Sequence, residues 1–237
     1  MSIRDALLTA MGGERGLAAA DRLCQGCVAL LKVDAAAICL VCDGVDVATL
    51  GASSPAARLY DELQFTLGEG PGLDAAAQRL PVLIDDLADS PGGDAHWLGY
   101  GEALLAQHIR SVYAVPIIVA GHCVGALAVF HAQPPAWTVE NFDGVAEAAE
   151  LAQLPILDLH GSDLDAASTD PGSAAWTELD PLTRSEVSNA TGMLMSQLNI
   201  TAATAVARLR AHAFATGRSA TSVARDVIDR RVQMESD

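Results

Sequence analysis

Three stretches near the C-terminal end share one apolar pattern: SNATGMLM at residues 188–195, AVARLRAHAF at 205–214 and SATSVARDVI at 219–228. Their apolar residues recur every three or four positions, which places them on one side of an α-helix. The pattern predicts helices over 183–199 and 202–216 and a third that begins after Ser219. Gly192 lies inside the first helix, where glycine costs about 1 kcal/mol relative to alanine. A glycine kept there indicates close approach by a neighbouring helix or a ligand.

The first of these helices divides into a buried stripe and an open flank when its residues are placed at 100° intervals. The predicted stripe consists of Val187, Ala190, Met193, Leu194 and Leu198. The predicted flank consists of Arg184, Ser188, Thr191, Met195 and, beside them, Gly192. The flank is small and partly polar, which leaves room for a close contact.

The two following helices carry arginines on their predicted outer sides. Arg208 and His212 are four residues apart, with Arg210 on another side of the same helix. Gly217 is predicted to end that helix as a left-handed cap, and Ser219 to cap the next. Read alone, these arginines fit ordinary solvated positions.

Charge is distributed unevenly along the 237 residues. The net charge is −16, with 7 Lys and Arg against 25 Asp and Glu before residue 183 and 7 Arg against 5 acids after it. Only the C-terminal part is therefore suited to a polyanion.

No apolar run approaches the ~20 residues of a membrane span, and no secretory signal is recognisable. We expect a soluble cytoplasmic protein.

The rest of the chain predicts an α+β fold: an antiparallel sheet with helices on one face. The predicted helices are Glu14–Leu31, Pro55–Leu63, a stretch ending at Arg79, Gly101–His108 and Thr138–Leu157. The predicted strands are Ala35–Cys42, Val45–Ala52, Pro81–Leu87, Ser111–Val119 and Cys123–His131. A Ser-, Asp- and Gly-rich stretch indicates a linker. The predicted divisions are 1–159, the linker 160–176 and an all-α bundle at 177–237.

Five motifs in the first division resemble those of GAF domains, which are small-molecule sensor modules. They are LGEGP at 67–71, DL at 86–87, Trp97, IRSVYAVPI at 109–117 and GALAVF at 125–130. The resemblance implies a pocket between the sheet and the segment around Trp97, with Asp86, His96, Trp97 and Tyr100 as candidate lining residues. By family it would hold a small organic molecule, a haem or nothing, and the sequence assigns no cofactor.

The C-terminal stretch resembles ANTAR domains, bacterial RNA-binding domains that control transcription termination. The matching residues are Ala190-x-Gly-Met-Leu-Met195, Ala205 with Leu209 and Arg210, and Val223-Ala224. The resemblance implies an RNA-binding set of Arg184, Ser188, Ala190, Thr191, Gly192, Met195, Arg208, Arg210 and Arg218. The chain departs from the family pattern at Thr191, where lysine is common, at Val206, where an aromatic is common, and at Thr216-Gly217, where asparagine is common. Loss of a lysine predicts either weaker RNA binding or compensation by Arg184, Arg210 and Arg218.

The cysteine spacing also raises the question of metal binding or redox chemistry. Cys24-x-x-Cys27 and Cys39-x-x-Cys42 have the spacing of a metal site. However, Cys39 and Cys42 are an odd number of residues apart on a strand and point to opposite sides. We therefore favour buried, non-ligating cysteines and predict no metal site, with Cys123 the best candidate for a reactive thiol. No catalytic motif is recognisable, so an enzyme is not predicted.

Together these patterns predict a signal-responsive antitermination regulator that binds hairpin-bearing nascent transcripts. The helices over 14–31 and 138–157 are predicted to form a homodimer interface, which would present two RNA-binding domains to two loops. The alternatives are a protein-interaction module whose arginines meet an acidic partner, and a redox or metal sensor that uses the cysteines.

Overall fold

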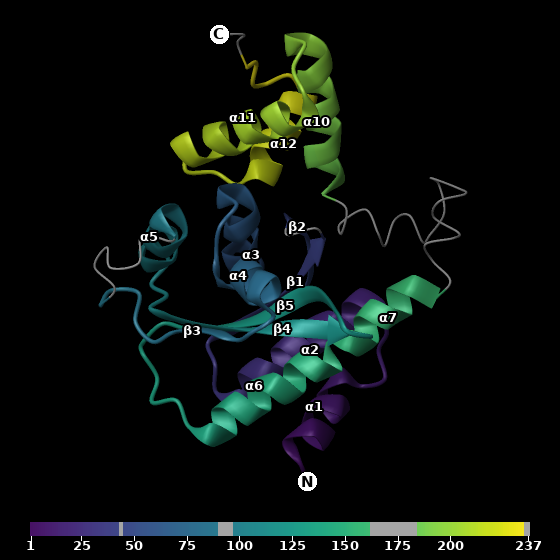
Figure 1. Cartoon of the computed structure of the whole chain (residues 1–237), viewed down its shortest axis with the longest axis vertical. Coiled ribbons are helices and arrows are strands. Elements are labelled where there is room, and N and C mark those ends of the chain that lie inside the picture. Colours follow the sequence, from purple (N-terminus) through teal and green to yellow (C-terminus); the bar gives the residue numbers. More distant parts are fainter. Residues whose placement is uncertain (43–44, 90–96, 162–183, 235–237) are drawn as a thin grey trace.

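The computed structural model describes residues 1–42, 45–89, 97–161 and 184–234. It contains a five-stranded antiparallel sheet with the strand order β2-β1-β5-β4-β3 (Figure 1). The strands are β1 (Ala35–Cys42), β2 (Val45–Ala52), β3 (Val82–Ile84), β4 (Ser111–Val119) and β5 (His122–His131). The helices before the C-terminal bundle are α1 (Ile3–Met11), α2 (Gly16–Leu31), α3 (Pro55–Leu67), α4 (Pro71–Gln78), α5 (Leu98–Ala106), α6 (Val139–Leu151) and α7 (Gln153–Gly161).

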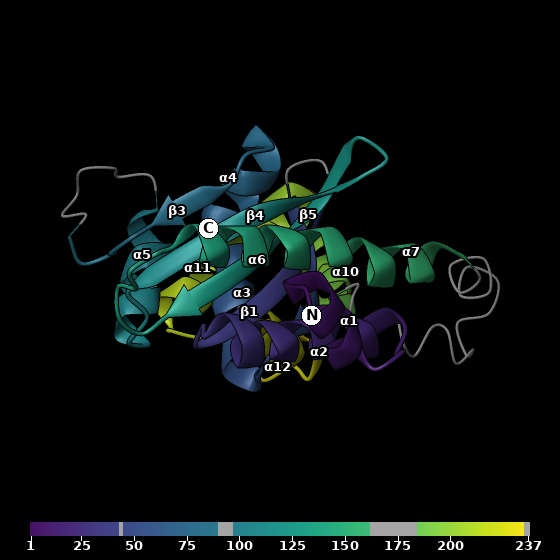
Figure 2. The same ribbon diagram turned by 90° about the horizontal axis from the view of Figure 1, so that it is seen from below.

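Helices cover both faces of the sheet, so the expectation of helices on one face was wrong. Helices α1, α2, α6 and α7 lie on one side and α3, α4 and α5 on the other (Figures 1 and 2). Alternate residues of β1 enter two separate cores: Ile38 packs with the first group, and Ala37 and Cys39 pack with the second. The nearly continuous apolar run of this strand is typical of burial on both faces.

The sequence placed most elements closely. β1, β2 and β4 have the predicted bounds, while β3 is reduced to three residues and α3 extends to Leu67 instead of Leu63. The LGEGP motif explains the last difference, because Gly68 ends α3 in the left-handed region at φ 73°. Its Glu69 carboxylate accepts hydrogen bonds from the backbone N–H groups of Gly99 and Tyr100. The motif therefore fixes the start of α5, whose first N–H groups have no partner within the helix.

Helix α1 was not predicted. Ser2 and Asp5 form a capping box at its start, and Gly12 ends it at φ 66°, which are sequence signals for a short helix. Leu7 of α1 is fully buried where α1 crosses α2 and α6 (Figure 2). The surface predicted to dimerise is thus partly covered by the chain's own first helix.

The C-terminal bundle consists of α10 (Ser185–Leu198), α11 (Ala202–Ala215) and α12 (Ala220–Ile228). Its bounds match the predicted helices to within two residues at each described end. Gly217 has φ 62°, and the Ser219 hydroxyl accepts a hydrogen bond from the Ser222 N–H, so both predicted caps are confirmed. Most of the predicted linker lies outside the described residues, whereas residues 160–161 belong to α7. Within the described ranges, no helix is long and apolar enough to cross a bilayer.

The sheet separates the cysteines of the two predicted pairs. Cys24 and Cys27 lie in the core beneath α2, while Cys39 lies in the core on the opposite face. Burial raises the pKa of Cys27 to about 12 and the pKa of Cys24 well above its usual value. The Cys42 side chain lies outside the described set. Three of the four cysteines therefore cannot converge on one ion.

Alkylation with iodoacetamide under native conditions is expected to modify Cys123 well before Cys24, Cys27 and Cys39. Cys123 is half-buried, whereas the other three are buried, and burial raises the pKa of Cys24 and Cys27. Peptide mass spectrometry after a time course checks the order, with urea-unfolded protein as the control in which all cysteines react. Native modification of Cys27 at the rate of Cys123 would contradict the structure.

Candidate functional site

One face of α10 is open and carries no charge. Its exposed residues are Ser188, Asn189, Gly192, Met195, Ser196 and Asn199. Gly192 is exposed within it, and a Cβ built on Gly192 meets nothing within 4 Å. A neighbouring helix in the described part of the chain is therefore not the reason for this glycine. The other predicted reason, close approach by a ligand, stays a prediction.

Two residues expected on this open face are buried instead. Arg184 is 7 % exposed and Thr191 is 8 % exposed. The Thr191 hydroxyl donates to the Val187 carbonyl at 2.6 Å. Arg184 precedes the first turn of α10 at φ 44°, so the helical periodicity does not apply to it. The predicted flank is thus reduced to Ser188, Gly192 and Met195, and Ala190 lies fully buried in the bundle.

Arginines of the predicted set already have contacts within the chain. The Arg184 and Arg210 guanidinium carbons lie 3.9 and 4.6 Å from the centroid of the Phe65 ring of α3. Arg218 forms an ion pair with Asp226 at 2.7 Å, and together with Arg231 it lowers the pKa of Asp226. Arg208 is half-buried on α11. The structure therefore separates the open α10 face from Arg184 and Arg210, which lie next to α3.

The end of α3 docks on the bundle. Phe65 is 6 % exposed and belongs to the apolar cluster of α10, α11 and α12. The adjacent Thr66 hydroxyl accepts a hydrogen bond from the Ala220 N–H at 3.1 Å. Sequence reasoning missed both residues. The available sequence signal was Phe65, an aromatic residue just beyond the predicted end of the helix at Leu63. Because α3 continues to Leu67, Phe65 lies on this helix and reaches the bundle.

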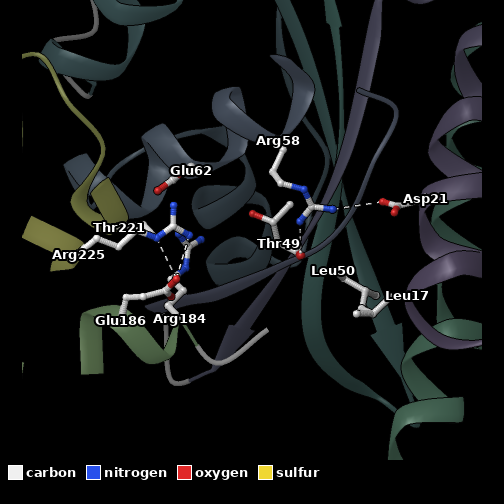
Figure 3. Close-up of a pocket in the computed structure, with 10 residues that line it drawn as sticks. All are labelled: Leu17, Asp21, Thr49, Leu50, Arg58, Glu62, Arg184, Glu186, Thr221 and Arg225. Carbon is white, nitrogen blue, oxygen red and sulfur yellow. Dashed lines mark hydrogen bonds and ion pairs between the residues drawn. The ribbon is translucent and has the colours of Figure 1, made fainter. Parts of the chain in front are cut away.

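A cleft of about 360 Å³ lies beside this contact, between the sheet domain and the bundle (Figure 3). Arg58 forms an ion pair with Asp21 across it and donates to the Thr49 carbonyl at 3.0 Å. Arg225 binds Glu186 at 2.8 Å on the bundle side. Four of the charged groups in the lining are thus neutralised in pairs.

A buried polar network underlies the cleft. The Asp61 carboxylate is fully buried and accepts hydrogen bonds from the Thr49 hydroxyl at 2.6 Å and the Gln64 amide at 3.1 Å. Gln64 in turn accepts from the Gly72 N–H at 2.7 Å. Burial raises the pKa of Asp61, opposed by these hydrogen bonds and by the Arg184 charge. The network ties α3 to β2 and to the start of α4.

The predicted ligand-pocket residues do not share one surface. Tyr100 is fully buried among core side chains, and Asp86 forms an ion pair with Arg110. The Trp97 indole donates to the Asp74 carboxylate at 2.9 Å, and its ring meets Tyr100 edge-on at 6.4 Å. His96 lies outside the described residues. Among the described members of this set, Trp97 and Tyr100 are brought together.

Comparisons with protein families match both parts of the chain. The GAF domain model matches residues 16–155, and the ANTAR domain model matches residues 180–228. No curated protein matches the chain.

Solved structures resemble the sheet domain. The GAF domain of an Acinetobacter phosphoenolpyruvate-protein phosphotransferase has TM-score 0.50 and 14 % identity, over 70 % of this chain and 99 % of its own. A putative GAF sensor protein from Burkholderia vietnamiensis has TM-score 0.45 and 18 % identity, over 66 % and 90 %. Free methionine-R-sulfoxide reductase from Neisseria meningitidis, solved with its substrate, has TM-score 0.47 and 15 % identity, over 69 % and 91 %. At 14 % identity, the likeness to the Acinetobacter GAF domain shows a shared fold and says nothing of function.

Replacement of Asp61 by asparagine is expected to change how stability depends on pH. Because the pKa of Asp61 is raised in the folded state, its contribution to stability is fully present below the unfolded pKa, about 3.9. That contribution is lost as the pH rises through the folded pKa. D61N removes this loss, so its free energy of unfolding relative to wild type should rise between pH 4 and pH 8.

Urea denaturation at several pH values measures this difference. D85N, at an exposed carboxylate, is the matched control and should follow the wild-type profile. A difference between D61N and wild type that is constant with pH would show that Asp61 does not titrate as its burial implies.

Proposed function

This chain belongs to the GAF domain family and carries an ANTAR domain after it, and from that premise we propose that it is a signal-responsive transcription antitermination regulator. GAF and ANTAR domains are regulatory domains, and the ANTAR domain is an RNA-binding antitermination domain. In the proposal, the bundle binds hairpin loops in nascent mRNA in the cytoplasm. The sheet domain responds to a small molecule or another signal.

The observation that carries the proposal is the open face of α10 around Gly192. A helix interior that accepts a glycine loses about 1 kcal/mol relative to alanine, and no described neighbour requires the glycine. Proteins that read RNA loops use close backbone approach and contacts with unstacked bases. Ser188 and Met195 lie on the same open face as Gly192 and supply a hydroxyl group and an apolar surface.

Charge supports the location of the RNA contact. The part of the chain before residue 183 carries a net charge of −18, whereas the part after it carries +2, so the first part repels a phosphate backbone. The arginines of the predicted RNA-binding set lie in the C-terminal part of the chain. In the proposal, their contacts with phosphate groups make RNA binding depend on salt. We expect affinity to fall as salt rises, with a slope of about −0.7 to −0.9 for each phosphate contact on a plot of log K against log salt.

A homodimer remains part of the proposal. Because α1 crosses α2 and α6, the surface that meets a second copy includes α1. Leu8 of α1 is 42 % exposed and Leu30 of α2 is 39 % exposed. Two bundles in one dimer would bind two linked hairpins with raised effective concentration.

Replacement of Gly192 by alanine is expected to separate stability from RNA binding. The added methyl group meets nothing within 4 Å, so the free energy of unfolding should rise by about 0.5–1 kcal/mol through helix propensity. The same methyl group occupies the space that the RNA needs, so binding to a two-hairpin RNA should weaken. Urea denaturation and gel-shift titration measure the two effects.

The matched control is Q197A, at an exposed position of α10 outside the open face, which should not show these opposed effects. If G192A binds hairpin RNA as tightly as wild type, the open face of α10 is not the contact surface. If wild-type protein binds no structured RNA at low salt, the proposed function itself is wrong.

A further inference from the structure

The contact between α3 and the bundle has an unusual chemical composition. A phenylalanine of the sheet domain lies within the apolar cluster of the RNA-binding domain, 6 % exposed. The guanidinium groups of Arg184 and Arg210 lie against its ring, at 3.9 and 4.6 Å from the centroid. Both distances are within the ~6 Å range of cation–π attraction. Two planar guanidinium groups thus lie against one aromatic ring.

Such a pair of guanidinium groups is suited to a nucleobase. Proteins that bind unpaired nucleotides stack the bases on arginine planes and aromatic side chains, because every base presents a π-face. Arg184 and Arg210 come from the start of α10 and from α11, so the fold brings them together from two different helices of the predicted RNA-binding segment.

A second contact places an oxygen beside the ring. The Thr66 hydroxyl is 3 % exposed and accepts from the Ala220 N–H at 3.1 Å. Ala220 is the first residue of the nine-residue helix α12, and such N–H groups have no partner within their helix. A helix N-terminus favours phosphate or another oxygen acceptor. Phe65 and Thr66 therefore present to the bundle an aromatic ring next to an acceptor oxygen, as a nucleotide does.

We propose that Arg184, Arg210 and the Ala220 N–H form a subsite for one unstacked nucleotide of the RNA loop, and that Phe65 and Thr66 occupy it within the chain. The inference rests on the proposed function and deepens it. The subsite takes either α3 or RNA, because both use the same two guanidinium groups. RNA binding at this subsite therefore requires the end of α3 to separate from the bundle. The open face of α10 makes the remaining contacts with the RNA.

The position of α3 links this exchange to the sheet domain. Asp61, one turn before Phe65, is hydrogen-bonded to Thr49 of β2, and Gln64 is bonded to Gly72 of α4. A change in the packing of β2 or α4 moves the helix end that carries Phe65. The affinity for RNA is then the intrinsic affinity multiplied by the fraction of molecules in which α3 has left.

The test measures the affinity of the full-length chain for a fluorescent two-hairpin RNA. F65A removes the ring, and F65L keeps most of the buried volume but removes the π-face. L59A, an apolar truncation at an exposed position of the same helix, is the control. F65A should bind RNA on the order of tenfold more tightly than wild type, F65L should also bind more tightly, and L59A should match wild type.

The arginines are tested in the F65A background, where the subsite is open. R184K and R210K keep the charge but lose the planar stacking surface. Each should weaken binding on the order of tenfold, the effect of one lost base stack. R225K is the matched control, since Arg225 pairs with Glu186 and has a side chain 62 % exposed. It should bind as F65A does.

A measurement on unmodified protein completes the test and does not depend on the folding of any variant. Addition of RNA should increase hydrogen exchange in residues 60–68, because α3 is displaced. Unchanged exchange there, equal RNA affinity of F65A, L59A and wild type, or equal effects of R184K, R210K and R225K would overturn the subsite. Absence of RNA binding by every variant would instead be the failure of the proposed function.

Discussion

Burial of the central strands on both faces organises the whole fold. β1 and β5 lie in the middle of the sheet, and their alternate side chains enter two different cores. Both cores need cover, so α2, α6 and α7 pack on one face and α3, α4 and α5 on the other. The placement of α3 on the outer face follows from this, and α3 is the element that meets the C-terminal bundle.

Helix α3 is shared between two apolar clusters. Tyr60 contributes to the core on the outer face of the sheet, and Phe65 contributes to the bundle. The buried Asp61 and Gln64 between them fix the helix to β2 and α4 through hydrogen bonds, because buried polar groups are stable only when paired. A helix held in this way moves as a unit. In the proposed exchange, α3 is therefore the element that links the sheet to the bundle.

The two surfaces of the bundle differ in their chemistry. The open face of α10 is uncharged and contains a glycine whose surroundings are empty. The surface next to α3 carries arginines that are stacked on a ring. The first suits recognition of shape at close range, and the second suits stacking and charge. A loop of RNA offers both kinds of contact, which is why the proposed function draws on both surfaces.

The sequence by itself determined the elements whose signals are local. The 3.6-residue period and the caps at Gly217 and Ser219 located the three helices of the bundle, and continuous apolar runs located β1 and β4. The capping box of Ser2 and Asp5 was equally local and was overlooked. The family motifs identified both domains, since they depend on residue type and order rather than on contacts.

Only the tertiary structure decided which of the predicted site residues are accessible. A helical wheel gives the direction of a side chain but not the width of the buried sector, so Thr191 at the edge of the stripe was misplaced. Arg184 was misplaced because it precedes α10 in a left-handed conformation, where the wheel does not hold. The partner of Arg184 and Arg210 is Phe65, more than a hundred positions earlier. Contacts over that separation depend on how two domains pack, and no periodicity within either segment carries that information.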